Sequence, residues 1–196
     1  MAWGKAGSTT KSSAGTGLSV SCLTASDINF VLIHQLSSTN VSPEYRLDGN
    51  CNTDYAYRKS NNGGADGTVT SDNNAQIDSN GGNNDKFAIL FFSNVDGEEK
   101  LAISFLVDRN TAGAGNAPNR TEGVSKVDTT TNTGQFTAID AETGGYAIGA
   151  DSNVSVLGSD ITTAAAISPT VIDGSIFYET DTKKEYVLYN GTWTEV

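Results

Sequence analysis

Two neighbouring stretches, residues 86–95 (KFAILFFSNV) and 100–107 (KLAISFLV), decide the fold class. In the second stretch large apolar residues alternate with small or polar ones, and a period of two is typical of a β-strand. Residues 96–99 (DGEE) join the stretches and contain Asp-Gly, a pair that favours a hairpin turn. We therefore predict two antiparallel strands. On the second strand the core-facing residues are expected to be Leu101, Ile103, Phe105 and Val107, opposite Ala102 and Ser104.

The strand pattern extends over most of the chain, and helix signals are almost absent. Residues 28–36 (INFVLIHQL) are apolar in both phases, which predicts an interior strand covered on both faces. About eight to ten strands with turn residues between them predict an all-β fold, a jelly-roll-like β-sandwich over residues 1–158. The other expected strands are residues 17–23, 122–127, 135–139 and 145–148, half-exposed strands at 45–47 and 55–58, and edge strands at 68–70 and 75–77.

The end of the chain is predicted to be a separate small unit. Residues 159–170 are interpreted as a linker, and residues 171–196 contain three short strand patterns separated by turn residues. A segment this short cannot hold an independent core. We therefore expect this β-meander to dock on the main domain or on a neighbouring subunit. The expected contacts are its apolar residues Ile176, Tyr178, Tyr186, Leu188 and Trp193.

Composition argues against two classes of partner. The 196 residues include 23 acidic and 12 basic ones, for a net charge of -11. Nucleic-acid binding needs clustered Lys and Arg, and an acidic surface is repelled by anionic membranes. Ser, Thr, Asn and Gly make up 42% of the chain. The sequence contains neither an apolar run of membrane-spanning length nor a signal-peptide pattern, so we expect a soluble chain that is not inserted into a membrane.

Residues capable of catalysis are few. The single histidine, His34, shares a phase with Phe30 and Leu32, so it is expected to be a core or interface residue and not a general base. One His and two Cys are too few for a zinc site. Cys22 and Cys51 either pair in a disulfide or remain two buried thiols. We predict no catalytic, cofactor-binding or metal-binding residue, and therefore no enzyme.

Two long Gly- and Asn-rich connections, residues 60–85 and 110–119, separate the strands. A connection as long as the first is uncommon in a compact domain and is usually functional or mobile. Within the first, residues 78–85 (DSNGGNND) partly match a calcium-binding loop but lack its fifth, sixth and twelfth positions. A plain flexible loop is the preferred interpretation, with Ca²⁺ as the alternative ligand. The acids of this connection show no spacing that selects a glycosidase pair.

The C-terminal stretch resembles the terminal β-meander of many phage and virus structural proteins, especially tail-fibre and head-surface proteins. Their pattern D-G-[ST]-I-F-x-E-T-D-T-x-K-x-Y-x-x-x-x-G-x-W is matched by residues 173–193. The main domain is also similar to small β proteins of marine viruses. The stretches that carry this likeness are residues 3–10, 55–58, 62–66 and 110–120. The resemblance implies a virion component assembled in the host cytoplasm, and it names no catalytic residue.

These observations predict a non-enzymatic virion structural protein, either a capsid decoration or a tail or fibre component on the particle exterior. Its partners would be other virion proteins and further copies of itself, by analogy in a trimer. The alternative is a receptor-binding adhesin on the same fold, in which Tyr55 and Tyr57 stack on host-surface glycans. Packing inside the protein is the competing interpretation of these two rings.

Overall fold

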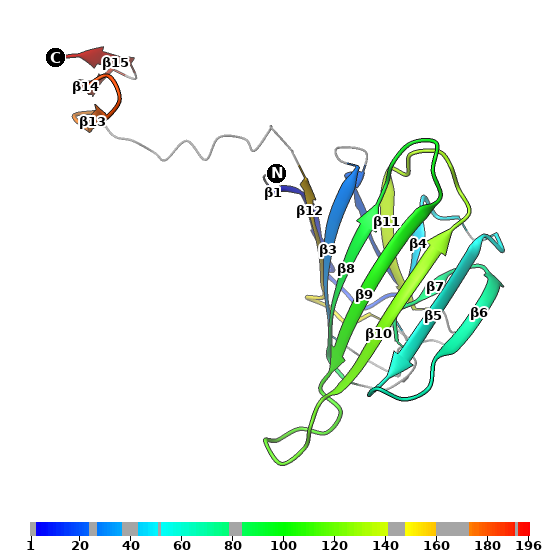
Figure 1. The fold of residues 1–196 in the computed structure, drawn as a ribbon. Helices are drawn as coiled ribbons and strands as arrows, with labels where there is room; N and C mark the ends of the chain where they lie inside the picture. The colour runs from blue at the N-terminus through cyan, green and yellow to red at the C-terminus, as the bar shows by residue number, and fades with distance from the viewer. Residues whose placement is uncertain are drawn as a thin grey trace. The chain divides into compact units, whose positions relative to one another are not determined.

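The structure, a computed structural model, describes residues 3–23, 27–36, 43–50, 52–78, 84–140, 148–159, 173–190 and 192–196. The chain divides into two compact units, Met1–Thr162 and Thr163–Val196 (Figure 1). Regular structure in the described ranges is β-strand, and none of these residues lies in an α-helix. Apart from Ser159, the predicted linker at 159–170 falls outside the described residues, as do 145–147 of one predicted strand.

The first unit is built from two antiparallel sheets that pack face to face, so the prediction of an all-β sandwich is confirmed. The larger sheet has eight strands, in the order β1 (Trp3–Thr10), β12 (Asn153–Ser159), β3 (Ile28–Gln35), β8 (Lys86–Ser93), β9 (Lys100–Asp108), β10 (Asn119–Val127), β5 (Tyr55–Asn61) and β6 (Gly67–Asp72). The smaller has four strands, in the order β2 (Gly17–Ser21), β11 (Gln135–Asp140), β4 (Pro43–Leu47) and β7 (Ala75–Gln76).

The order of the strands shows that the chain passes repeatedly from one sheet to the other. β1 and β3 belong to the larger sheet, whereas β2 and β4 belong to the smaller one. At one edge β1 pairs with β12, with Trp3 opposite Ser159 and Thr10 opposite Asn153. Neither β1 nor β12 was among the predicted strands. β1 (WGKAGSTT) has no alternation of large apolar residues, while β12 does alternate Val154 and Val156, which both point into the core.

Aromatic rings from both sheets fill the space between them. The ring of Tyr45 on β4 stacks on Phe136 with 5.3 Å between centroids, and meets Tyr55 of the larger sheet edge-on at 6.3 Å. The hydroxyls of Tyr45 and Ser125 share a hydrogen bond of 2.7 Å between the sheets. β4 is therefore almost wholly buried, and the expectation of a half-exposed strand at 45–47 is wrong. β5 begins buried and becomes partly exposed towards its end.

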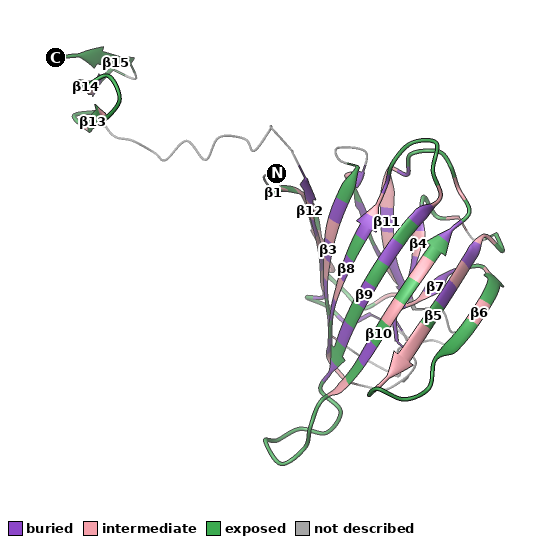
Figure 2. Ribbon diagram, in the orientation of Figure 1, coloured by how far each residue is buried: buried purple, intermediate pink, exposed green. Residues whose placement is uncertain are grey.

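The inward side of the larger sheet has small residues where these aromatic rings approach. On β9 the inward residues are Lys100, Ala102, Ser104, Leu106 and Asp108, and on β10 a Cβ added to Gly123 would lie 2.8 Å from Ser104 Oγ. The predicted orientation of β9 is therefore wrong, because the alternating burial in Figure 2 places the larger apolar residues on the outside. Interiors are close-packed, so the bulky side chains of the opposite sheet require small ones here.

A buried ionic cluster lies between the end of the smaller sheet and the larger one. Nζ of Lys86 is 2.6 Å from Oδ2 of Asp78 and 3.8 Å from Oδ2 of Asp108, and all three side chains are at most 2% exposed. Thr121 donates a hydrogen bond from Oγ1 to Asp78 Oδ1 (3.2 Å). The Asn110 backbone N–H donates to Asp108 Oδ1 (2.6 Å). Buried charges require such partners, so the cluster ties β8, β9 and β10 to Asp78, two residues after the end of β7.

The second unit is a meander of three antiparallel strands, β13 (Ile176–Glu179), β14 (Lys184–Tyr189) and β15 (Thr192–Glu195). Phe177 lies opposite Tyr186, and Leu188 lies opposite Trp193. The Phe177 ring is 6.1 Å from that of Trp193 and 6.2 Å from that of Tyr186, so these aromatic residues share one face.

Candidate interaction surface

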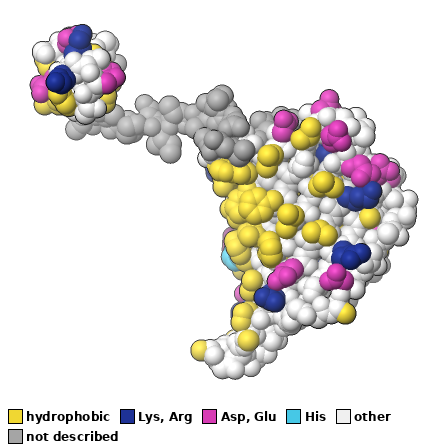
Figure 3. Space-filling model, in the orientation of Figure 1, with side chains coloured by type: hydrophobic (Ala, Val, Ile, Leu, Met, Phe, Trp, Pro, Cys, Tyr) yellow, Lys and Arg dark blue, Asp and Glu magenta, His cyan; other side chains and the backbone are white. Residues whose placement is uncertain are grey.

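The side of the eight-stranded sheet that turns away from the smaller sheet is covered with large apolar side chains. We call this surface the outer face. Figure 3 shows its apolar side chains as a continuous yellow area over β3, β8 and β9. Its exposed members are Trp3 on β1, Ile28 on β3, Phe87 and Phe91 on β8, Leu101, Ile103, Phe105 and Val107 on β9, and Val124 on β10.

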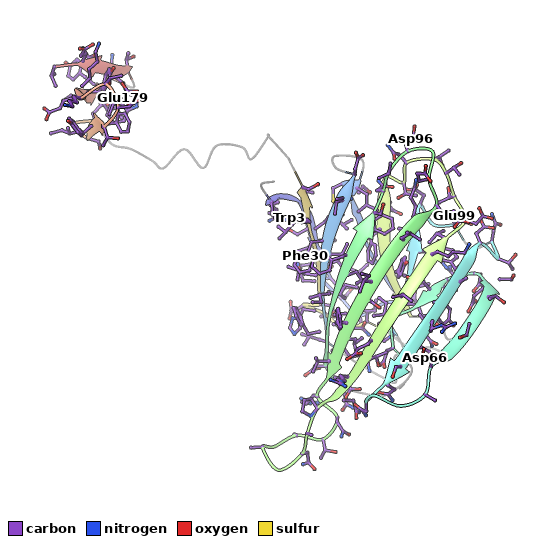
Figure 4. All side chains as sticks on the ribbon, in the orientation of Figure 1. Trp3, Phe30, Asp66, Asp96, Glu99 and Glu179 are labelled. Atoms are coloured by element: carbon purple, nitrogen blue, oxygen red, sulfur yellow. The ribbon has the colours of Figure 1, made fainter. Side chains whose placement is uncertain are left out.

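Strand register joins these side chains into one surface. A row of directly opposed residues crosses five strands, from Leu157 through Phe30, Phe91 and Ile103 to Val124. Opposed residues of neighbouring strands have Cβ atoms about 4.5–5.5 Å apart, so the side chains of the row touch. Ring centroids of Phe30 and Phe91 are 4.8 Å apart, and Trp3 meets Phe30 edge-on at 6.4 Å (Figure 4).

The exposed area is larger than a monomer normally leaves open. The nine exposed side chains are each 38–56% exposed. Taking about 200 Å² for a fully exposed large side chain, together they present roughly 800 Å² of apolar surface. The largest apolar patch on a typical monomeric protein is about 300–600 Å², and larger patches mark interaction sites.

Charge is almost absent from the middle of the outer face. The outward positions of β12, β3, β8 and β9, strands that the structure describes in full, hold no Asp, Glu, Lys or Arg. Charged groups lie at its two borders: Lys5 on β1 is exposed beside Leu157, and the outward charges of β10 and β5 are paired within the chain. These pairs are Lys126–Glu99 at 3.0 Å, Arg58–Asp66 at 3.6 Å and Arg120–Glu122 at 3.5 Å. The β10 and β5 border of the outer face therefore adds no net charge, although the chain as a whole carries -11.

His34 lies on the outer face. It is exposed, and it is opposed by Phe87 on one side and Asn153 on the other. The expectation of a core position is wrong because the phase that His34 shares with Phe30 and Leu32 points outward. The other part of that expectation, an interface histidine, stays a prediction.

The two tyrosines expected to meet glycans are buried in the sandwich. Tyr55 is 0% and Tyr57 is 8% exposed, so the expectation that these rings lie at the surface is wrong. The Tyr55 hydroxyl accepts a hydrogen bond from the Leu47 backbone N–H (3.0 Å), and the Tyr57 hydroxyl donates to Asp72 Oδ2 (3.0 Å). Burial raises the pKa of both phenols above the ordinary value. Both side chains point inward because they occupy the inward phase of β5.

The five predicted docking residues of the meander do not form one surface. Tyr186, Leu188 and Trp193 lie on the face that also carries Phe177, and Leu188 is buried there. Ile176 and Tyr178 belong to the opposite phase of β13 and are exposed. Each face of the meander therefore presents its own aromatic or aliphatic residues, and docking through either stays a prediction.

The structure describes only parts of the predicted calcium loop and cysteine pair. Residues 79–83 and Cys51 lie outside the described residues. Asp78, the first residue of the loop, is bound by Lys86, and no group of three or more His, Cys, Asp or Glu within the described part of the chain is placed to hold a metal ion. Cys22 carries a free, half-buried thiol, and burial raises its pKa. None of the described residues belongs to a helix that could cross a membrane.

The sequence carried one signal for the outer face. Residues 28–36 and 86–92 are apolar in both phases, which is typical of strands covered on both sides. The smaller sheet covers the inward side of β3 and β8, whereas their outward side remains open over the described residues. The double apolar pattern is therefore explained only if something else covers the outer face.

No protein family model matches the chain, and no curated protein or solved structure matches it either.

Proposed function

We propose that the protein is a non-enzymatic structural subunit that assembles with other proteins through its outer face. The observation that carries this proposal is roughly 800 Å² of connected apolar surface without charge at its centre. In keeping with the resemblance of the C-terminal stretch, the assembly is a virion. The chain then serves as a capsid decoration or as a tail or fibre component on the particle exterior.

The arrangement of the acidic residues supports a role without catalysis. Glycoside hydrolysis requires two carboxylates facing each other across a sugar cleft. Among the acids of the first long connection, Asp66 pairs with Arg58 and Asp85 pairs with Arg109 at 3.2 Å. Asp72 accepts the Tyr57 hydroxyl, and Asp78 binds Lys86. Each of these four carboxylates has a different partner, so they do not form such a pair across a cleft.

The adhesin alternative has lost the two residues that suggested it, because Tyr55 and Tyr57 present no exposed ring. A glycan site would also need polar groups converging on a sugar, whereas the outer face offers mainly hydrocarbon. A structural contact therefore fits this surface better than a sugar does.

Particle fractionation tests the proposed function. In a lysate of virus-producing cells, we expect the chain to sediment with assembled particles in a density gradient and to remain attached in 1 M salt (roughly a 3 Å screening length), since apolar contacts are not screened. Antibody against the chain should label intact particles. A chain that stays in the soluble fraction, and is missing from the mass spectrum of purified particles, would contradict the virion role.

A further inference from the structure

We propose that the first partner to cover the outer face is a second copy of this chain, bound face to face about a two-fold axis. This inference rests on the proposed function, because it names the partner of the same assembly surface. It requires three properties of the outer face: sufficient area, electrostatic compatibility with itself, and a centre that can lie on a symmetry axis.

The area matches a stable dimer. A standard protein–protein interface buries about 800 Å² on each partner. The outer face presents roughly that area from its nine exposed apolar side chains alone. A shallow groove on this face, lined in part by Ile28, Phe91, Leu101, Ile103 and Val124, provides a depression for side chains of the partner.

Electrostatics favours a second copy over other partners. A chain with a net charge of -11 repels its own copies over most of its surface, but not where charge is absent or cancelled in pairs. A basic partner would need acidic residues facing it, and an acidic partner would need unpaired Lys or Arg. The outer face offers neither at its centre: its one cation outside the ion pairs, Lys5, lies at the β1 edge, and three ion pairs neutralise its β10 and β5 border. A second copy brings the same neutral apolar surface to the contact.

The geometry places the symmetry axis near the middle of the sheet. Exposed apolar residues extend from Trp3 on β1 to Val124 on β10, and the opposed pair Phe91 and Ile103 on β8 and β9 lies between them. In a two-fold interface a residue close to the axis contacts its own counterpart in the partner. Ile103, 49% exposed, is therefore expected to lie beside Ile103 of the second copy.

Sedimentation of the full chain tests this pairing. We expect a species of twice the 20.5 kDa chain mass at micromolar concentration. Ile103→Asp places two like charges near the axis of each dimer and should weaken association by about 1000-fold, since a central hot spot is lost from both partners. Ala114→Asp adds the same charge in the exposed 110–119 connection and should leave association unchanged. Circular dichroism of both variants should match the parent, because neither side chain lies in the core.

Disulfide trapping tests the symmetry separately. In a Cys22→Ala, Cys51→Ala background, Ile103→Cys should form a covalent dimer on mild oxidation, and Ala114→Cys should not. A stable trimer, or an oligomer that neither dissociates with Ile103→Asp nor cross-links at position 103, would overturn the two-fold inference while leaving an assembly role intact. A monomer at 100 µM (about 100-fold above a micromolar dissociation constant) would overturn it as well. The particle gradient then decides the proposed function independently.

Discussion

Replacing Lys86 by Met removes the only cation within 4 Å of the Asp78 and Asp108 carboxylates among the described residues, since Lys59 donates only to the Asp78 backbone carbonyl (3.3 Å). Asp78 Oδ2 loses a partner at 2.6 Å and keeps the hydrogen bond from Thr121. Asp108 keeps the hydrogen bond from the Asn110 N–H. The variant therefore holds two carboxylates at the sandwich interior without the cation that contacts them both.

The expected loss follows from the burial of the pair. Removing one member of a buried ion pair typically costs about 3–5 kcal/mol, because the other charge stays desolvated. Asp78 and Lys86 are both about 1% exposed, so solvent does not reduce this cost. We expect Lys86→Met to lower the free energy of unfolding by about 3–5 kcal/mol. The double variant with Asp78→Asn should lose less than the two single losses together, because the charge of Asp78 is gone and only that of Asp108 stays without its cation.

Urea unfolding followed by circular dichroism at pH 7 (near-neutral, with ordinary carboxylates ionised) measures these changes. All variants are compared at one protein concentration, so that self-association contributes equally. Lys126→Met is the matched control, because Nζ of Lys126 lies 3.0 Å from Glu99 but both side chains are 41–51% exposed. An exposed pair contributes about 0–1 kcal/mol. If Lys86→Met destabilised the protein no more than Lys126→Met, the buried cluster would not stabilise the sandwich in the way described.

Three further substitutions or conditions test the core. Tyr45→Phe removes the hydrogen bond to Ser125 and should lower the free energy of unfolding, measured by thermal unfolding, by about 1 kcal/mol. Tyr189→Phe, at a 74% exposed site, should leave it unchanged. Equal losses in the two variants would contradict a stabilising role for the Tyr45 hydrogen bond. Because burial raises the pKa of Tyr57, the free energy of unfolding should stay constant up to about pH 10 and fall as the pH rises further. A urea midpoint that does not change between about pH 9 and 11.5 would argue against this. Gln35 is 1% exposed, and its amide has no hydrogen-bond partner among the described residues. Gln35→Leu should therefore raise the free energy of unfolding by about 1 kcal/mol. A lower melting temperature would refute this.

The fold class could be predicted because alternation and turn residues are local signals. The hairpin stretches at 86–95 and 100–107 became β8 and β9 with nearly the predicted bounds. β1 could not be predicted in this way, since a Gly- and Thr-rich edge strand is held by its pairing with β12 and not by its own pattern. Pairing between strands far apart in sequence leaves little local trace.

The candidate site illustrates what a period of two does not specify. Alternation divides Leu101 and Ala102 between two faces of a strand, but it does not say which face the second sheet covers. That choice depends on volume, because Tyr45 and Phe136 of the opposite sheet need small neighbours. The same ambiguity affects Tyr57, whose ring could be assigned to sugar binding or to packing until the phase of β5 was known.

The pairing of β1 with β12 has a consequence for synthesis of the chain. Their partners are separated by about 143–156 positions, from Thr10 opposite Asn153 to Trp3 opposite Ser159. At about 5–20 residues per second, the first strand waits on the order of 10 s for its neighbour to leave the ribosome. β8, β9 and β10 are consecutive in sequence and pair with one another, so they need no such delay. The part of the outer face that lies on β3, β8, β9 and β10 can thus form on the nascent chain before β12 and β1 complete the sheet.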